Sequence, residues 1–291
     1  SCIMLPMTHG TQLLFPATSY KSRRVRMISK AVMTVLLTGF IAGILVTGAQ
    51  MLRVTPLILQ AETYELGEFA VPHTHAASRI THQHKLNGAA LDKHLQIKDV
   101  HDIQTSASTD PEQSWAPADG MERTFYTLVS NIITAIAFSL MLVAVYLLRG
   151  KPVNYVSGLL WGAAGFAVFS GSTALGLPPE LPGMTAAALE SRQIWWIGTV
   201  IATATGIGLL IESKTILPKF IAAVLIAVPH IIGAPHPHVF ESNVPAELSA
   251  QFAVASLLTS VFFWMVLGAA SGYFYQKLVL ESSRPLETFT V

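Results

Sequence analysis

Six long apolar segments, separated by polar connections, constrain the fold of this chain more than any other feature. They are residues 31–52, 125–148, 156–177, 194–211, 217–232 and 252–275. A helix needs about 20 mostly apolar residues to cross a bilayer core about 30 Å thick. Hydrophobic residues make up 52% of the chain and charged residues only 12%, well below the roughly 25% charged residues of soluble domains. The sequence therefore predicts an all-α, polytopic integral membrane protein with about six transmembrane helices.

The spacing of these segments predicts the organisation of the chain. Residues 1–26 are expected to be a leader that is disordered or not native, with Met27 as an alternative start. Residues 27–60 carry the first transmembrane helix, 61–123 form a histidine-rich acidic loop, 124–277 form a five-helix membrane domain, and 278–291 form a tail. Only four residues separate the fourth and fifth apolar segments, which predicts a helical hairpin.

Lysine and arginine alternate between the connections, and this pattern predicts the orientation. Basic residues are retained on the cytoplasmic side of short loops. They precede the first segment and follow the second, fourth and sixth, at Lys21, Arg23, Arg24, Arg26, Lys30, Arg149, Lys151, Lys214, Lys219, Lys277 and Arg284. Both termini are therefore expected in the cytoplasm, with residues 62–123, 178–193 and 233–251 on the outer face of the plasma membrane.

Nine of the ten histidines gather in two stretches, both in or beside the predicted outer connections. They are His73, His75, His82, His84, His94 and His101 in the first stretch, and His230, His236 and His238 in the second. Cys2 is the sole cysteine, so a metal would be bound by nitrogen and oxygen ligands. We expect these histidines to bind a divalent transition metal, because imidazole and carboxylate suit cobalt, nickel and zinc alike. The alternatives are a solvated linker for the long loop and, for His230, a side chain that reaches the headgroups.

Other classes of function lack their motifs. The chain has no G-x-x-x-x-G-K-[ST] sequence for ATP hydrolysis and no H-E-x-x-H sequence for a zinc protease. The sequence predicts no enzyme, no nucleic-acid partner and no permanently bound cofactor, only a transported divalent metal. A metal-sensing or metal-storing accessory protein without a conducting pathway remains an alternative, because outer histidines alone would serve it.

Small and polar residues inside the apolar segments predict how the helices pack. Gly39 with Gly43, Gly158 with Gly162, and Gly268 with Gly272 have the spacing that lets helix backbones approach closely. Polar side chains inside the segments, expected to find interhelical partners, are Gln50, Asn131, Ser139, Thr199, Thr203, Thr205 and Thr259. Arg53 is expected to pair with Glu62 or a neighbouring carboxylate. Residues 185–193 are expected to form an interfacial helix.

Four irregular motifs at the ends of the apolar segments resemble a known family. They are RVTPLILQAETYE from Arg53, WAPADGMERT from Trp115, LPPELPGM from Leu177 and PHIIGAPHP from Pro229. In this order, and over about residues 27–277, they are similar to the proposed cobalt transporter subunit family CbtA. The family is usually described with five spans, one fewer than the six segments here, and residues 1–26 have no counterpart in it.

The resemblance implies cobalt uptake for cobalamin biosynthesis, together with a small single-span partner, CbtB, that has its own histidine motif. Nickel is the alternative ion. Membrane lipid and further copies of the chain are the other expected partners. In the mechanism that we expect, the loop from His73 to His101 gathers metal. His236, His238 and His230 then lead the ion to the outer end of the fifth segment, near Glu180 and Met184.

Overall fold

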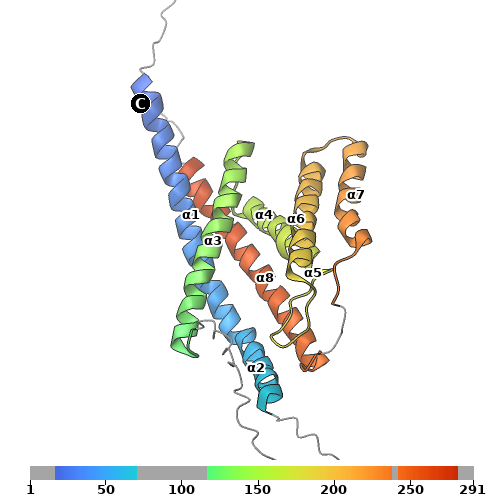
Figure 1. The fold of residues 1–291 in the computed structure, drawn as a ribbon. Coiled ribbons are helices and arrows are strands. Elements are labelled where there is room, and N and C mark those ends of the chain that lie inside the picture. Colours follow the sequence, from blue (N-terminus) through green and yellow to red (C-terminus); the bar gives the residue numbers. More distant parts are fainter. Residues whose placement is uncertain (1–16, 71–116, 238–241, 281–291) are drawn as a thin grey trace, which may run out of the picture.

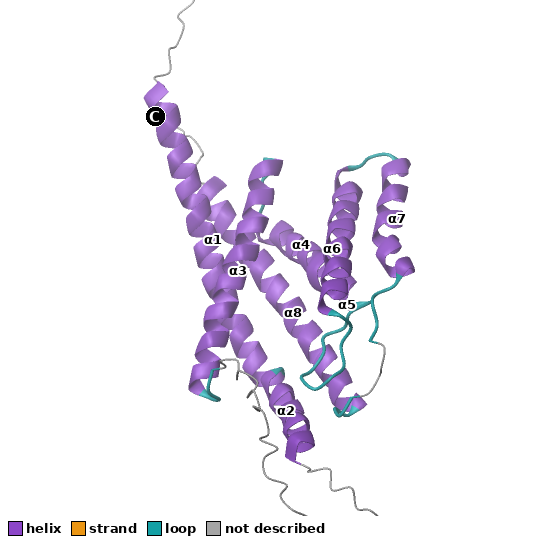
Figure 2. Ribbon diagram, in the orientation of Figure 1, coloured by secondary structure: helices purple, strands orange, loops and turns teal. Residues whose placement is uncertain are grey.

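The structure, a computed structural model, describes residues 17–70, 117–237 and 242–280, and most of these are helical (Figures 1 and 2). The helices are α1 (Ala17–Arg53), α2 (Thr55–Ala70), α3 (Met121–Arg149), α4 (Tyr155–Phe166), η1 (Ala167–Gly171), α5 (Ser172–Ala174), α6 (Leu189–Glu212), α7 (Ile216–Ile232), α8 (Ala246–Phe274) and η2 (Tyr275–Leu280). Both η elements are π-helices. The predicted all-α membrane class is confirmed.

Four of the described helices have the length and composition of membrane spans. They are Val25–Arg53 within α1, α3, α6, and Ala246–Leu280, which joins α8 to η2. The shorter α7 is also apolar. The third predicted segment is helical too, but η1 divides it into α4 and α5, which follow one another without a break. Each of the six predicted segments therefore coincides with helical structure, and the number that crosses the membrane stays a prediction.

The structure differs from the predicted boundaries in three places. Helix α1 begins at Ala17, inside the predicted leader. Helix α2 covers the first ten residues of the predicted outer loop, because Ala61 is fully buried and Leu57 and Ile58 pack in the same apolar cluster. No separate interfacial helix forms over residues 185–193; α6 begins at Leu189 and includes the end of that segment.

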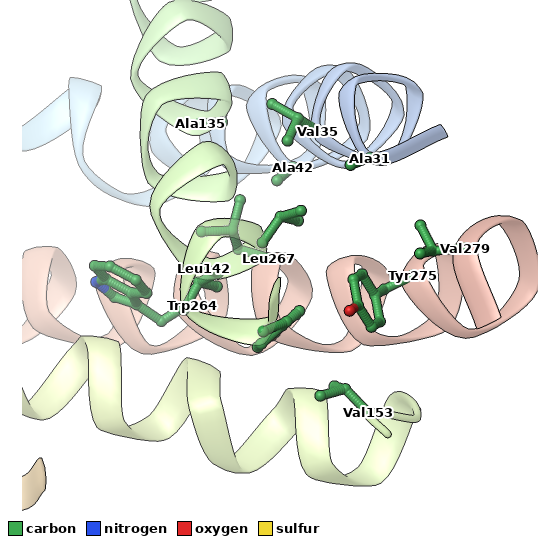
Figure 3. Close-up of a cluster of buried hydrophobic side chains, with 12 residues drawn as sticks. Ala31, Val35, Ala42, Ala135, Leu142, Val153, Trp264, Leu267, Tyr275 and Val279 are labelled. Carbon is green, nitrogen blue, oxygen red and sulfur yellow. The ribbon is translucent and has the colours of Figure 1, made fainter. Parts of the chain in front are cut away.

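The helices pack as a bundle with a hairpin at one side (Figure 1). Helix α1 lies along α3 and α8, and α4 lies along the other side of α8. Helices α6 and α7 form the predicted hairpin, which packs mainly against α5 and η1. A core of buried side chains fills the space between α1, α3 and α8, with Leu142 and Leu267 near its middle and Trp264 toward one edge (Figure 3).

The glycine pairs lie at the helix crossings, as predicted. A Cβ atom at Gly268 would lie 2.4 Å from the carbonyl oxygen of Gly158, so α4 and α8 touch through their backbones. A Cβ atom at Gly39 would lie 2.7 Å from Cα of Ile136, which places α1 equally close to α3. These contacts exclude any side chain larger than hydrogen without a shift of the helices.

The connections alternate between the two ends of the bundle (Figure 1). At one end Arg149, the last residue of α3, and Lys151, two residues further on, both pair with Glu212, where α6 ends. At the other end an apolar cluster joins α2 to the connection before α6 and to the start of α8, with Ala61, Leu181 and Leu248 among its members. The predicted basic connections thus share one end, and which end faces the cytoplasm stays a prediction.

Candidate metal-handling site

Two of the nine predicted metal ligands lie in the described part of the chain. His236 is exposed in the irregular stretch that follows α7. His230 is half-buried in the last turn of α7, where its ring lies edge-on to Trp195 with 6.0 Å between the ring centroids. Trp195 Nε1 also donates a hydrogen bond of 3.1 Å to the carbonyl oxygen of Pro229. The hairpin is thus joined by an aromatic and a polar contact beside His230.

The remaining ligands, His73, His75, His82, His84, His94, His101 and His238, lie outside the described residues. Within residues 17–70, 117–237 and 242–280, no group of three histidine, cysteine or acidic side chains is placed to hold a metal ion. The convergence of His230, His236 and His238 on one ion stays a prediction.

The two neighbours predicted for this histidine site have other partners. Glu180 Oε2 accepts a hydrogen bond of 2.7 Å from Arg192 Nη1, which neutralises its charge. The Met184 sulfur accepts hydrogen bonds from the Leu181 backbone N–H at 3.3 Å and from Ser249 Oγ at 3.4 Å. Glu180 therefore joins the connection before α6 to α6 itself, and Met184 joins the same connection to α8.

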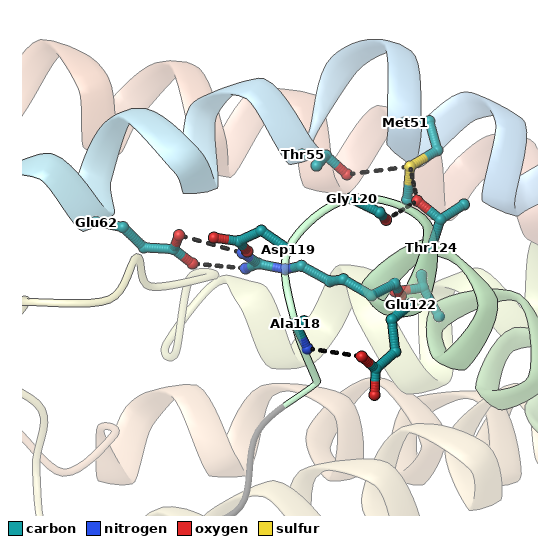
Figure 4. Close-up of polar contacts among 10 residues, drawn as sticks. Met51, Thr55, Glu62, Ala118, Asp119, Gly120, Glu122 and Thr124 are labelled. Atoms are coloured by element: carbon teal, nitrogen blue, oxygen red, sulfur yellow. Dashed lines mark hydrogen bonds and ion pairs between the residues drawn. The ribbon is translucent and has the colours of Figure 1, made fainter.

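An ion pair joins α2 to α3 at the same end (Figure 4). Arg123 donates to both carboxylate oxygens of Glu62, at 2.5 and 3.1 Å, and to Asp119 at 3.0 Å. The predicted pairing of Arg53 with Glu62 is wrong. Nine residues along a helix span about 13 Å, so Glu62 lies beyond the reach of Arg53, which has no ion-pair partner among the described side chains.

Polar contacts continue from this ion pair toward the middle of the bundle. The Met51 sulfur accepts hydrogen bonds from Thr55 Oγ1 at 3.9 Å and from Thr124 Oγ1 at 3.8 Å (Figure 4). Thr124 is the next residue after Arg123 on α3, and Asn131 follows about two turns further. A row of polar side chains therefore extends along the contact between α1 and α3.

Asn131 is the deepest member of this row, and its amide is held in one orientation. Its Nδ2 donates to Thr47 Oγ1 at 2.9 Å and to Gln50 Oε1 at 2.6 Å. Thr47 Oγ1 in turn donates to the carbonyl oxygen of Gly43 at 2.7 Å. Both N–H donors of Asn131 are thus engaged, which leaves its carbonyl oxygen as an acceptor.

A partly open cavity of about 240 Å³ lies beside this amide, between α1, α3 and α8. The residues that line it are Val46, Gln50, Val54, Asn131, Thr134, Ser256, Thr259, Ser260 and Phe263. Six of them have an amide or hydroxyl group, and none is charged. The Ser256 hydroxyl is buried without a hydrogen-bond partner.

Aromatic rings border the cavity on one side. Phe263 lines the cavity and lies 5.6 Å from the ring of Trp264 and 6.1 Å from that of Phe138. Trp264, which is only 1% exposed, stacks on Phe169 at 5.6 Å with 12° between the planes. The row of polar side chains therefore ends against a packed apolar cluster.

The gathering of these polar groups was not predicted, although Gln50, Asn131 and Thr259 were each recognised as polar residues inside apolar segments. A signal was present in the sequence. Thr124, Thr127, Asn131 and Thr134 recur every three or four residues, which places them on one face of a helix.

Comparison with known proteins identifies one family. The model of the family described as "Probable cobalt transporter subunit (CbtA)" matches residues 28–276. No curated protein and no solved structure matches the chain. The match covers most of the chain, including every helix from α2 to α8 and the cavity between α1, α3 and α8. The chain therefore belongs to the CbtA family of probable cobalt transporter subunits.

Proposed function

We propose that this chain is the membrane subunit that brings a divalent transition metal, cobalt, into the cell for cobalamin biosynthesis. Histidines of the outer connections capture the ion, and the helix bundle conducts it inward. The chain acts with a small single-span subunit of the CbtB kind, in the plasma membrane, with both termini in the cytoplasm.

The observation that carries this proposal is the polar cavity inside the bundle. A receptor or storage protein needs ligands only at the surface, whereas a transporter also needs polar groups part-way through the membrane. Gln50, Asn131 and Ser256 supply such groups between α1, α3 and α8, in helices with the composition of membrane spans. Polar groups are costly in hydrocarbon and mark transport routes there.

The arrangement of the connections supports capture on one side. Both ends of the histidine-rich segment, at α2 and at the start of α3, lie at the same end of the bundle as the connection from α7 to α8 (Figure 1). The basic residues Arg149 and Lys151 lie at the opposite end. Basic connections are typical of the cytoplasmic side, so the histidines would face the outside.

Cobalt uptake by native cells tests the proposal. In one strain the chromosomal copy is removed, and in a second strain it is replaced by a variant that lacks residues 73–101. Removal should abolish uptake of radioactive cobalt at low concentrations. The deletion should weaken uptake mainly at low cobalt and leave the maximal rate nearly unchanged, because a loop that gathers the ion does not conduct it.

Nickel in excess serves as the competitor, and an immunoblot of the membrane fraction serves as the control for protein level. Uptake that is equal with and without the chain would contradict the transport function. If unlabelled nickel inhibited the uptake of radioactive cobalt more strongly than unlabelled cobalt does, nickel would be the transported ion. Cobalt binding to cells without accumulation inside them would favour the accessory role.

A further inference from the structure

We infer that the cavity between α1, α3 and α8 is the binding station at which the transported divalent cation rests inside the membrane, with its water shell retained. The inference rests on the proposed function and specifies its route. Asn131 is the residue that contacts the hydrated ion, and Gln50 and Thr47 are positioning residues that hold its amide. Ser256 lines the same cavity, with its hydroxyl covered by neighbouring atoms.

Interhelical packing accounts for the two N–H donors of Asn131 but not for its carbonyl oxygen. The two N–H donors of Asn131 bridge α3 to Thr47 and Gln50 of α1, and this is the role expected of polar residues between membrane helices. The bridge uses both N–H donors, so the carbonyl oxygen of Asn131 is left as an acceptor, and Asn131 lines the cavity. Across the contact with α8, the Ser256 hydroxyl is buried without a partner, and buried polar groups of native proteins are ordinarily paired with protein or water.

The size of the cavity fits a hydrated ion. A volume of 240 Å³ holds roughly eight water molecules at about 30 Å³ each, and a divalent first-row metal ion retains about six waters in its inner shell. Amide and hydroxyl oxygens that accept hydrogen bonds from coordinated water hold such an ion without removing its shell. Retention of the shell avoids the cost of removing the inner-shell waters from the ion, which is part of the cost of placing a charge in a low-dielectric interior.

The absence of charged groups from the lining fits a station rather than a permanent site. No carboxylate or imidazole lines this cavity, so binding there is weak. Conduction requires sites that are favourable enough to enter and weak enough to leave. Selection among metals then belongs to the imidazole ligands outside the bundle, because oxygen ligands discriminate poorly between cobalt and other divalent ions.

A cysteine at position 256 tests this assignment, because a thiolate binds cadmium tightly. Native cells whose own copy carries Cys2→Ser receive either Ser256→Cys or Thr203→Cys. Thr203 is the matched control, since its hydroxyl is also buried without a partner, but it lies on α6 and does not line the cavity. Micromolar cadmium should slow cobalt uptake at least about tenfold in the Ser256→Cys strain and leave the Thr203→Cys strain at the rate of its parent.

A second substitution, Ser256→Leu, fills the cavity with an apolar side chain. It should lower the maximal rate of cobalt uptake at least about tenfold while cobalt binding at the cell surface is retained, whereas Thr203→Val should transport normally. Immunoblots of the membrane fraction confirm that each variant is present.

The outcomes distinguish the route from the function. The parent strain transports cobalt if the proposed function is correct. If the Ser256→Cys strain in cadmium and the Ser256→Leu strain then both transport cobalt at the parental rate, the ion passes elsewhere. That result overturns the assignment of the cavity and leaves the proposed function standing. If the parent strain does not accumulate cobalt, the proposed function fails and the assignment fails with it. Cadmium block of both cysteine variants would also overturn the assignment, because the effect would not be specific to the cavity.

Discussion

The crossing of α4 and α8 provides a quantitative test of the fold through Gly268→Ala. The added Cβ atom would lie 2.4 Å from the carbonyl oxygen of Gly158 and 2.7 Å from Cα of Gly162. An ordinary contact begins at 3.4 Å, so the two helices must separate by about 1 Å. The obstructing atoms belong to the backbone and cannot rotate away. Overpacking of this kind costs about 1–3 kcal/mol, and we expect the free energy of unfolding to fall by that amount.

Gly208→Ala is the matched control. Gly208 lies in α6 with no atom within 4 Å of an added Cβ, and alanine is about 0.5–1 kcal/mol more favourable than glycine in a helix interior. The same chemical change should therefore destabilise at position 268 and stabilise at position 208. Unfolding of the purified protein in mild detergent by titration with sodium dodecyl sulfate, followed by tryptophan fluorescence, measures both effects, since Trp264 is buried near the crossing.

The double variant Gly158→Ala with Gly268→Ala sharpens the test. Both methyl groups enter the same crossing, so the separation forced by the first makes room for the second, and the combined cost should be less than the sum. A Gly268→Ala protein as stable as the parent, beside a stabilised Gly208→Ala protein, would refute the close approach of α4 and α8.

Three further predictions concern the end of the bundle that holds the ion pair and His230. Glu62→Gln should lower the free energy of unfolding by about 1 kcal/mol, because Glu62 and Arg123 are partly exposed. Adding Arg123→Gln should lower it little further, and additive losses would show that the two side chains do not interact. If His230 is a ligand, His230→Phe should abolish cobalt uptake although it retains a ring beside Trp195, while His230→Gln should keep a small rate; normal uptake by the phenylalanine variant would make His230 a packing residue. Cobalt capture by the histidine-rich segment should weaken as pH falls below about 6.5, because protonated imidazole does not coordinate metal, and cobalt binding to intact cells at pH 5.5 and 7.5 checks this.

The apolar segments and glycine pairs made much of the fold predictable, because a membrane helix must be long and apolar and small residues must lie where backbones meet. The connection of only four residues at 212–215 likewise predicted that α6 and α7 form a hairpin. These features depend on local sequence alone.

The features that were missed depend on contacts between distant segments. The acidic residues of α2 indicate a loop, although Leu57, Ile58 and Ala61 form an apolar face on this helix. Closeness in sequence favours a pair of Arg53 with Glu62, whereas in the structure Arg123 reaches Glu62 from another helix. The cavity could not be predicted from the sequence for the same reason. Gln50 and Asn131 each look like isolated polar residues, and only the packing of α8 places Ser256 beside them.

The packing of α8 between α1 and α4 also sets a constraint on the synthesis of the protein. Helices α1 and α3 leave the ribosome early, with the amides of Gln50 and Asn131 already able to pair. The hydroxyl side of the cavity and the α4 contact at Gly268 arrive only with α8, the last long helix of the described part. Until then one wall of polar groups and the glycine face of α4 lack their partner helix. The bundle between α1, α3 and α4 can therefore be completed only after α8 has been synthesised.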